Sequence, residues 1–139
     1  MKYDLIVTRD SDKDFARSIL LPVTTASFNQ FLDTETQLQL LAQVKDASVL
    51  MVWRFSFAPD DRINDQMYNS LLLAGKLKQL GAAYVATFYP YFPYARQDKS
   101  EEDTATLGLV EVTAHLLKGV GVREVITCDL HAPAVIGAL

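Results

Sequence analysis

The stretch Ser48-Val49-Leu50-Met51-Val52-Trp53-Arg54-Phe55 decides the fold class, because it is apolar at nearly every position. A run of this length is typical of a central β-strand that is covered on both faces. Pro59 and the pair Asp60-Asp61 end the strand signal. A helix of about five turns is expected next, because apolar residues recur at helical spacing until Gly81. These residues are Ile63, Met67, Leu71, Leu72, Ala74, Leu77 and Leu80.

Strand and helix signals continue to alternate on both sides of this unit. Strands are predicted at residues 5–7, 82–89 and 123–128, and helices at residues 11–21 and 104–118. Strands that alternate with helices of this length are typical of βαβ units with right-handed crossovers. We therefore expect one domain over residues 1–139, with an α/β fold in which helices flank a mostly parallel open sheet.

Residues 31–41 carry a different pattern, in which apolar and polar residues alternate. Thr34, Thr36, Leu38 and Leu40 fall on one side, and Glu35, Gln37 and Gln39 on the other. This pattern predicts a half-exposed strand that pairs antiparallel with its neighbour or forms a projecting β-hairpin.

Composition narrows the classes of partner. The 139 residues include 13 Lys+Arg and 17 Asp+Glu, so the net charge of −4 gives no general attraction to nucleic acid or to an anionic membrane. No apolar run approaches the ~20 residues of a membrane span, and the N-terminus lacks a secretory pattern. We expect a cytoplasmic location, with neither nucleic acid nor membrane as partner.

Cysteine and histidine are too few for several kinds of site. Cys128 is the only cysteine, which excludes an internal disulfide and a multi-cysteine zinc site. His115 and His131 are the only histidines. A bound metal, if there is one, is expected to be a hard cation such as Mg²⁺ carried by phosphate oxygens.

Two polar segments follow predicted strands directly. They are Tyr94-Ala95-Arg96-Gln97-Asp98-Lys99 and Asp129-Leu130-His131. If the two strands are adjacent and parallel, both segments share one edge of the sheet, where ligands of open α/β sheets bind. Guanidinium, ammonium, carboxylate and imidazole groups there could meet a phosphorylated ligand. The alternative is a solvated loop, with His131 an ordinary polar residue after a strand.

Aromatic and acidic residues offer two further candidates. Tyr89, Tyr91, Phe92 and Tyr94 could form a wall for a flat ring or, more commonly for aromatic residues, a rigid turn packed on the core. Asp33 and Glu35 at positions i and i+2 of a strand would share a face and could accept hydrogen bonds from an exocyclic amine. Two solvent-facing acids would give the same pattern. The chain has no P-loop with Gly-Lys-Ser/Thr, which excludes a nucleotide hydrolase of that type.

At these residues the sequence resembles the ribose-phosphate diphosphokinase family, also called phosphoribosyl pyrophosphate (PRPP) synthetases. Residues 90–99 nearly repeat the family's ATP-loop signature, and residues 127–132 resemble its metal-site Asp-Leu-His-Ala. Phe31, Asp33 and Glu35 match its Phe-x-Asp-Gly-Glu segment. The resemblance covers essentially the whole chain and corresponds to the N-terminal half of such an enzyme. It implies a phosphoribosyltransferase-like fold with a β-hairpin extension.

The resemblance also implies an activity and roles for residues. The family is a transferase of nucleotide biosynthesis, a kinase that transfers diphosphate from MgATP to ribose 5-phosphate. By this resemblance Arg96 and Gln97 would contact ATP, Asp98 would shape the loop, and His131 would hold the Mg²⁺–ATP phosphates with support from Asp129.

A second part of the implied site comes from a neighbouring subunit. Phe31, Asp33 and Glu35 resemble a clamp on the adenine of ATP that one subunit presents to another. A homo-oligomer, at least a dimer, is therefore implied.

The sequence departs from the family in three respects. Thr34 replaces the expected Gly, residues 100–103 are acidic where the family is usually basic, and the family's downstream catalytic loop and ribose-phosphate loop lie beyond Leu139. We therefore expect the C-terminal ribose-phosphate-binding domain to be absent from this chain, and the isolated chain to be inactive. A non-catalytic regulatory or assembly subunit, or another nucleotide-binding α/β domain, is the alternative interpretation.

Overall fold

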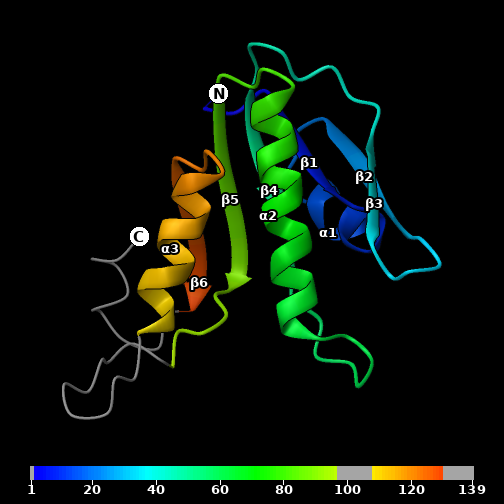
Figure 1. Ribbon diagram of the computed structural model, residues 1–139. Helices are drawn as coiled ribbons and strands as arrows, with labels where there is room; N and C mark the ends of the chain where they lie inside the picture. The colour runs from blue at the N-terminus through cyan, green and yellow to red at the C-terminus, as the bar shows by residue number, and fades with distance from the viewer. Residues whose placement is uncertain (1, 97–107, 130–139) are drawn as a thin grey trace.

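The computed structural model describes residues 2–96 and 108–129, and in this part of the chain six strands form one sheet (Figure 1). The strand order is β3-β2-β1-β4-β5-β6. The strands are β1 (Leu5–Arg9), β2 (Val23–Gln30), β3 (Thr36–Leu40), β4 (Ser48–Val52), β5 (Tyr84–Tyr91) and β6 (Glu124–Asp129). All neighbouring pairs are parallel except β2 and β3. The predicted α/β fold with a mostly parallel sheet is confirmed.

Helices cover the two faces of the sheet. In the described residues α2 (Ile63–Gln79) and α3 (Leu109–Gly119) lie on one face, and the short α1 (Lys13–Arg17) lies on the other (Figure 1). The chain moves from β1 to β2 in one direction and from β4 to β6 in the other. Because parallel crossovers keep a right-handed sense, this reversal places the helices on opposite faces. The reversal point lies between β1 and β4, as in doubly wound sheets.

The apolar run that decides the fold class forms the central strand β4, as predicted. Residues Val49 to Val52 are all buried. Val49 and Met51 join the core under α2, whereas Leu50 and Val52 join the cluster under α1. Cover on both faces explains why the strand is apolar at successive positions.

The helix predicted over residues 11–21 is wrong in its extent. A 3₁₀ turn occupies Asp10–Asp12, α1 ends at Arg17, and Leu20 takes a positive φ of 58° with its side chain 87% exposed. Apolar spacing indicated a longer helix, but a left-handed residue does not continue an α-helix.

The strand predicted over residues 31–41 is correct only in its second half. Residues 31–35 form the turn of a hairpin, in which the Thr34 amide donates to the Phe31 carbonyl at 2.9 Å. β3 then begins at Thr36 and keeps the expected alternation. Its partner β2 carries many polar, half-exposed residues, which explains why the sequence did not reveal it. The antiparallel pairing itself is confirmed.

The remaining predicted elements are found with small shifts of their ends. α2 ends before Gly81, whose φ is +89°. β5 begins and ends two residues later than predicted, and the described part of the predicted helix 104–118 is α3. Residues 104–107 lie outside the described residues. Across residues 2–96 and 108–129, no helix is long and apolar enough to cross a membrane.

A charged bridge joins the segments that follow the carboxyl ends of β1 and β4. The buried Asp12 carboxylate accepts hydrogen bonds from Arg9 Nε at 2.8 Å and from Arg54 Nε at 3.0 Å. The Arg9 guanidinium also lies over the Trp53 ring, 4.5 Å from its centroid. These side chains tie the segment after β1 to the segment after β4.

Candidate functional site

The carboxyl edge of β5 and β6 brings together the two polar segments that the sequence singled out. The strands are adjacent and parallel, and Tyr91 at the end of β5 pairs with Asp129 at the end of β6. This is the arrangement on which the sequence prediction depended. Arg96 follows β5 by five residues and is exposed. Gln97, Asp98, Lys99 and His131 lie outside the described residues.

Two of the four clustered aromatic residues lie in the hydrophobic core rather than at a ligand-binding surface. Tyr89 and Phe92 are fully buried, with ring centroids 6.2 Å apart. Burial raises the pKa of Tyr89, so its phenol stays neutral, and its oxygen lies 3.1 Å from the hydroxyl of Ser70 on α2. Tyr91 and Tyr94 are only half-buried. For Tyr89 and Phe92 the rigid turn is therefore the correct interpretation.

Tyr94 takes an unusual backbone conformation two residues before Arg96. Its φ is +65°, in the left-handed region that costs a non-glycine residue about 1–2 kcal/mol. The Tyr94 phenol donates a 2.6 Å hydrogen bond to Asn64 Oδ1 in the first turn of α2. Burial raises the pKa of Tyr94, which keeps the phenol protonated as a donor. The bond therefore fixes the backbone that leads to Arg96.

Phe57 belongs to this edge, and sequence reasoning missed it. It lies in the segment between β4 and α2, and its ring contacts Tyr91 edge to face, with centroids 5.1 Å apart and planes at 79°. The Phe57 side chain is 67% exposed. The available signal was a large aromatic residue among small and turn-forming residues just beyond the central strand, in Ser56-Phe57-Ala58-Pro59-Asp60.

The hairpin residues do not join this edge within one chain. Phe31, Asp33 and Glu35 are exposed in the turn between β2 and β3. β1 and β4 separate β2 from β5, a distance of roughly 14 Å at the usual strand spacing. The expectation that Asp33 and Glu35 share one face of a strand is wrong, because both lie in the turn, where Asp33 Oδ1 accepts a 3.2 Å hydrogen bond from the Glu35 amide.

A hollow of about 670 Å³ lies between this hairpin and the first half of α2. Thr34 and Glu35 line it from the hairpin, and Arg62, Asp65 and Tyr68 line it from α2 and its N-terminus. Thr36 Oγ1 donates to Asn69 Oδ1 at 3.0 Å and so fixes the hairpin against the helix. The turn residues are therefore held in place although they are exposed.

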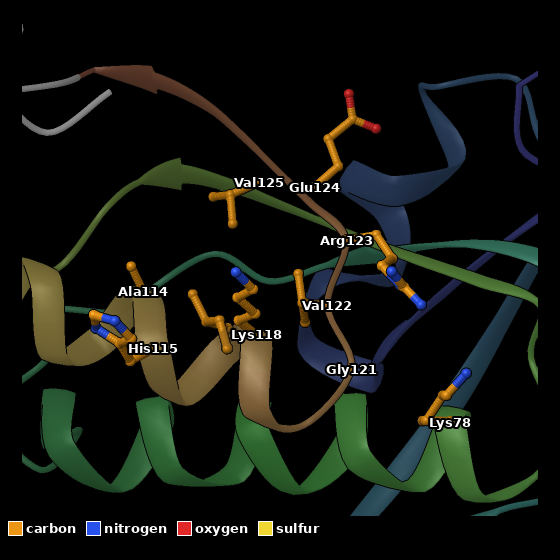
Figure 2. A pocket seen from close by; sticks show the side chains of 10 residues that line it. Lys78, Ala114, His115, Lys118, Gly121, Val122, Arg123, Glu124 and Val125 are labelled. Atoms are coloured by element: carbon orange, nitrogen blue, oxygen red, sulfur yellow. The ribbon is translucent and has the colours of Figure 1, made fainter. Parts of the chain in front are cut away.

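A second hollow, of about 660 Å³, lies at the opposite end of β6 from the candidate edge (Figure 2). Figure 2 shows Lys78 on α2 and Arg123 just before β6, on the two sides of Gly121. Gly121 has φ +99°, and a Cβ there would lie 3.0 Å from Lys78 Cγ, so this turn requires glycine. The hollow opens at the amino ends of the strands, so it is separate from the candidate edge.

The described residues do not form a metal site made of protein ligands alone. Within the described residues no three His, Cys, Asp or Glu side chains are grouped closely enough to hold a metal ion. Mg²⁺ commonly keeps one or two carboxylates and takes its other ligands from water and substrate phosphates.

The fold and this edge define a doubly wound α/β domain with a candidate ligand site at the carboxyl ends of its strands. A family model described as the N-terminal domain of ribose phosphate pyrophosphokinase matches residues 6–121. The chain therefore belongs to this family, as the sequence motifs indicated.

Individual relatives agree with this assignment. Ribose-phosphate pyrophosphokinase of Marinomonas sp. (strain MWYL1) is 28% identical over 137 residues, which cover 96% of this chain and 42% of that protein. The Wolinella succinogenes protein of the same name is 32% identical over 124 residues, 89% of this chain and 38% of that protein. The chain thus spans about two fifths of the length of the curated relatives it matches.

A solved structure supports the fold. The crystal structure of phosphoribosylpyrophosphate synthetase from Mycobacterium smegmatis matches 98% of this chain and 46% of that chain, with a TM-score of 0.84 and 23% identity. At this identity the likeness establishes the fold.

Proposed function

We propose that this chain is the ATP-binding part of a ribose-phosphate diphosphokinase, an enzyme that transfers diphosphate from MgATP to ribose 5-phosphate. One observation supports the proposal most directly: β5 and β6 are adjacent and parallel. The Arg96 segment and the Asp129 segment therefore both follow strand ends at the same edge of the sheet. The family assignment supports the same reaction class.

Positioning and charge neutralisation are the main requirements of phosphoryl transfer. Arg96 would form charge-assisted hydrogen bonds with ATP phosphate oxygens, for which a guanidinium is well suited. By family resemblance Gln97 would also contact ATP, Asp98 would shape the loop, and His131 and Asp129 would face the metal-bound phosphates. Mg²⁺ bound with ATP would supply further neutralisation of the transferred group.

A second copy of the chain would complete the site. Phe31, Asp33 and Glu35 lie three strands along the sheet from the Arg96 segment of their own chain. By family resemblance they would instead meet the Arg96 edge of a neighbouring chain. The turn that carries them is fixed against α2 and exposed to solvent, as a projecting clamp requires.

Ribose 5-phosphate would bind mainly through the part of the family's length that this chain does not span. We therefore expect the chain alone to bind ATP and to release no AMP from ATP and ribose 5-phosphate.

Titration calorimetry with MgATP tests the proposal. Arg96→Ala should weaken ATP binding about tenfold or more, because it removes a charge-assisted contact to phosphate. Arg123→Ala is the matched control, since Arg123 is also exposed but lies at the amino end of β6. Equal affinity in the Arg96→Ala variant and the unmodified chain, or no ATP binding at all, would contradict the proposal.

A further inference from the structure

The hydrogen bond between Tyr94 and Asn64 joins two segments that lie 30 residues apart in the sequence. Tyr94 precedes Arg96 by two residues and has a φ of +65°, and Asn64 lies in the first turn of α2. A left-handed backbone at a residue other than glycine persists only where its surroundings hold it, and such residues cluster at functional sites. This bond is therefore the candidate for what sets the direction of the Arg96 segment.

The start of α2 is a fixed support for Tyr94. Gln66 is buried, accepts from the Ser56 amide at 2.8 Å through Oε1, and donates to the Ser56 carbonyl at 2.8 Å through Nε2. Arg9, the last residue of β1, donates to the same Oε1 at 3.4 Å. The beginning of α2 is thus tied to β1 and to the segment that follows β4, so Asn64 presents its oxygen from an anchored helix.

Burial changes abruptly along the segment that contains Tyr94. Phe92 is fully buried and Ala95 is 5% exposed, whereas Arg96 is exposed. The Tyr94 ring packs against the core. A return of Tyr94 to a negative φ would turn the chain at this point, withdraw Ala95 from its packed position and redirect Arg96.

We propose that Asn64 and Tyr94 are positioning residues for ATP binding: their hydrogen bond holds the left-handed backbone that directs the Arg96 guanidinium at the nucleotide. The inference rests on the proposed function and names the contacts that make Arg96 effective. They touch each other and not the ligand.

The size of the effect follows from the conformational equilibrium at Tyr94. The left-handed region disfavours a non-glycine residue by a factor of about 5–30, and a side-chain hydrogen bond shifts an equilibrium about fivefold. A ligand that binds only one conformation loses affinity in proportion to the fraction of chains that leave that conformation. Loss of the bond should therefore weaken ATP binding about fivefold, and by no more than Arg96→Ala does.

Substitutions at Tyr94 separate backbone direction from side-chain contact. Calorimetry with MgATP should show that Tyr94→Phe, which keeps the ring and loses the phenol, weakens binding about fivefold. Tyr94→Ala should weaken binding at least as much. Tyr94→Gly should bind ATP more tightly than Tyr94→Ala, because glycine adopts the left-handed region without a steric penalty. If the Tyr94 side chain contacted ATP itself, the glycine variant would have no such advantage.

Substitution of Asn64 tests the other partner of the bond. Asn64→Ala should weaken MgATP binding as much as Tyr94→Phe does, and the double variant should lose no more, because each change removes the same bond. In the Arg96→Ala background, Asn64→Ala should change the affinity by less than about twofold. Gln79→Ala removes an exposed amide at the other end of α2 and is the control, which should bind ATP as the unmodified chain does.

Nuclear magnetic resonance of the chain labelled with ¹³C-tyrosine gives a readout that does not require ATP. The Cα chemical shift of Tyr94 depends on its φ, so it should change in Asn64→Ala and stay the same in Gln79→Ala.

The outcomes distinguish this inference from the proposed function. If Arg96→Ala weakens ATP binding but Tyr94→Phe and Asn64→Ala do not, the positioning inference is wrong and the proposed function stands. If Asn64→Ala has its full effect in the Arg96→Ala background, or if the Tyr94 Cα shift is unchanged by Asn64→Ala, the bond does not act through the direction of Arg96 and the inference is again overturned. No ATP binding by the unmodified chain would overturn both.

Discussion

Thr34 is the residue at which the chain departs most clearly from a simple backbone rule. Its φ is +74°, in a region that a β-branched side chain rarely adopts. Thr34→Gly should therefore increase the free energy of unfolding by about 0.5–1 kcal/mol, since relief of the strain exceeds the entropy that glycine adds to the unfolded chain. Denaturant unfolding, with the midpoint and slope measured separately, tests this expectation.

Thr36→Gly is the matched control for this prediction. Thr36 lies two residues later, inside β3, where it bonds to Asn69 and needs no special φ. The Thr36→Gly substitution should lower the free energy of unfolding. If both variants are destabilised to the same extent, the strain at Thr34 is not the cause.

For individual residues, the sequence indicated part of the candidate site. The position of Arg96 and Asp129 at the carboxyl edge of the sheet was predictable, because both follow strands that the sequence predicted to be buried and parallel. The exposure of Phe57 was not, because it depends on Gln66, nine residues away, whose amide fixes the preceding backbone. The positive φ of Tyr94 likewise depends on packing that no local pattern records.

Among the elements, the N-terminal segment is joined to the edge strand β6 by a polar cluster. Tyr3 donates to Glu124 Oε2 at 2.6 Å, Tyr84 donates to the same oxygen at 3.2 Å, and Lys2 bonds to Oε1 at 2.6 Å. Burial, followed by the bond to Glu124, raises the pKa of Tyr3 to about 12. The bonds from Lys2 and Tyr3 lower the pKa of Glu124. The contribution of this cluster to stability therefore depends on pH in both the alkaline and the acidic range.

The direction of each response follows from linkage between protonation and folding. Because the Tyr3 pKa is raised above its ordinary value of 10, its contribution is complete below pH 10 and is lost as the pH rises towards 12. Because the Glu124 pKa is lowered, its contribution is present above its ordinary value of 4.5 and is lost as the pH falls through the lowered value.

The Tyr3→Phe variant tests the expected loss of the Tyr3 contribution to stability at alkaline pH. Urea unfolding of the unmodified chain and of the variant should differ most below pH 10, and the difference should shrink between pH 10 and 12. Tyr68→Phe is the control, because Tyr68 is an exposed tyrosine on α2. A stability difference that stays constant across this range would show that the Tyr3 phenol does not act through its protonation.

Element prediction succeeded where one chemical property dominated a whole segment. β4 is apolar at every position after Ser48 and α2 keeps helical spacing over its 17 residues, so both were found from the sequence. β2 mixes Thr, Ser and Asn with few large apolar residues and becomes a strand by pairing with β1 and β3. α1 is shorter than its pattern because the residues before it, Arg9 and Asp12, bond across to Arg54 and the chain turns at Leu20.

For the whole molecule, the distance between the hairpin turn and the Arg96 edge leads to a prediction about assembly. If the hairpin completes a neighbour's site, the chain should dimerise in a concentration-dependent way. Phe31→Ala should weaken the dimer about tenfold, because Phe31 is a half-exposed aromatic of the kind that anchors interfaces. Sedimentation velocity over a dilution series measures this effect.

Phe57→Ala is the comparison variant for assembly, since Phe57 is also exposed but follows the central strand β4 and packs on Tyr91, away from the β2–β3 hairpin. It should leave the dimer unchanged. A strict monomer at about 100 μM, where a contact with a micromolar dissociation constant would be occupied, would rule out the shared site.

The bridge of Arg9, Asp12 and Arg54 has a consequence for competition among ligands. Asp12 is tethered three residues from Arg9, so its carboxylate meets the two guanidiniums at an effective concentration of at least millimolar order. A free anion that binds these guanidiniums no more tightly than a carboxylate cannot displace Asp12 at lower concentration, so the chain's own carboxylate occupies both guanidiniums at the strand reversal. Under the proposed function, the chain itself therefore disfavours phosphate binding at the strand reversal and leaves the β5–β6 edge to phosphorylated ligands.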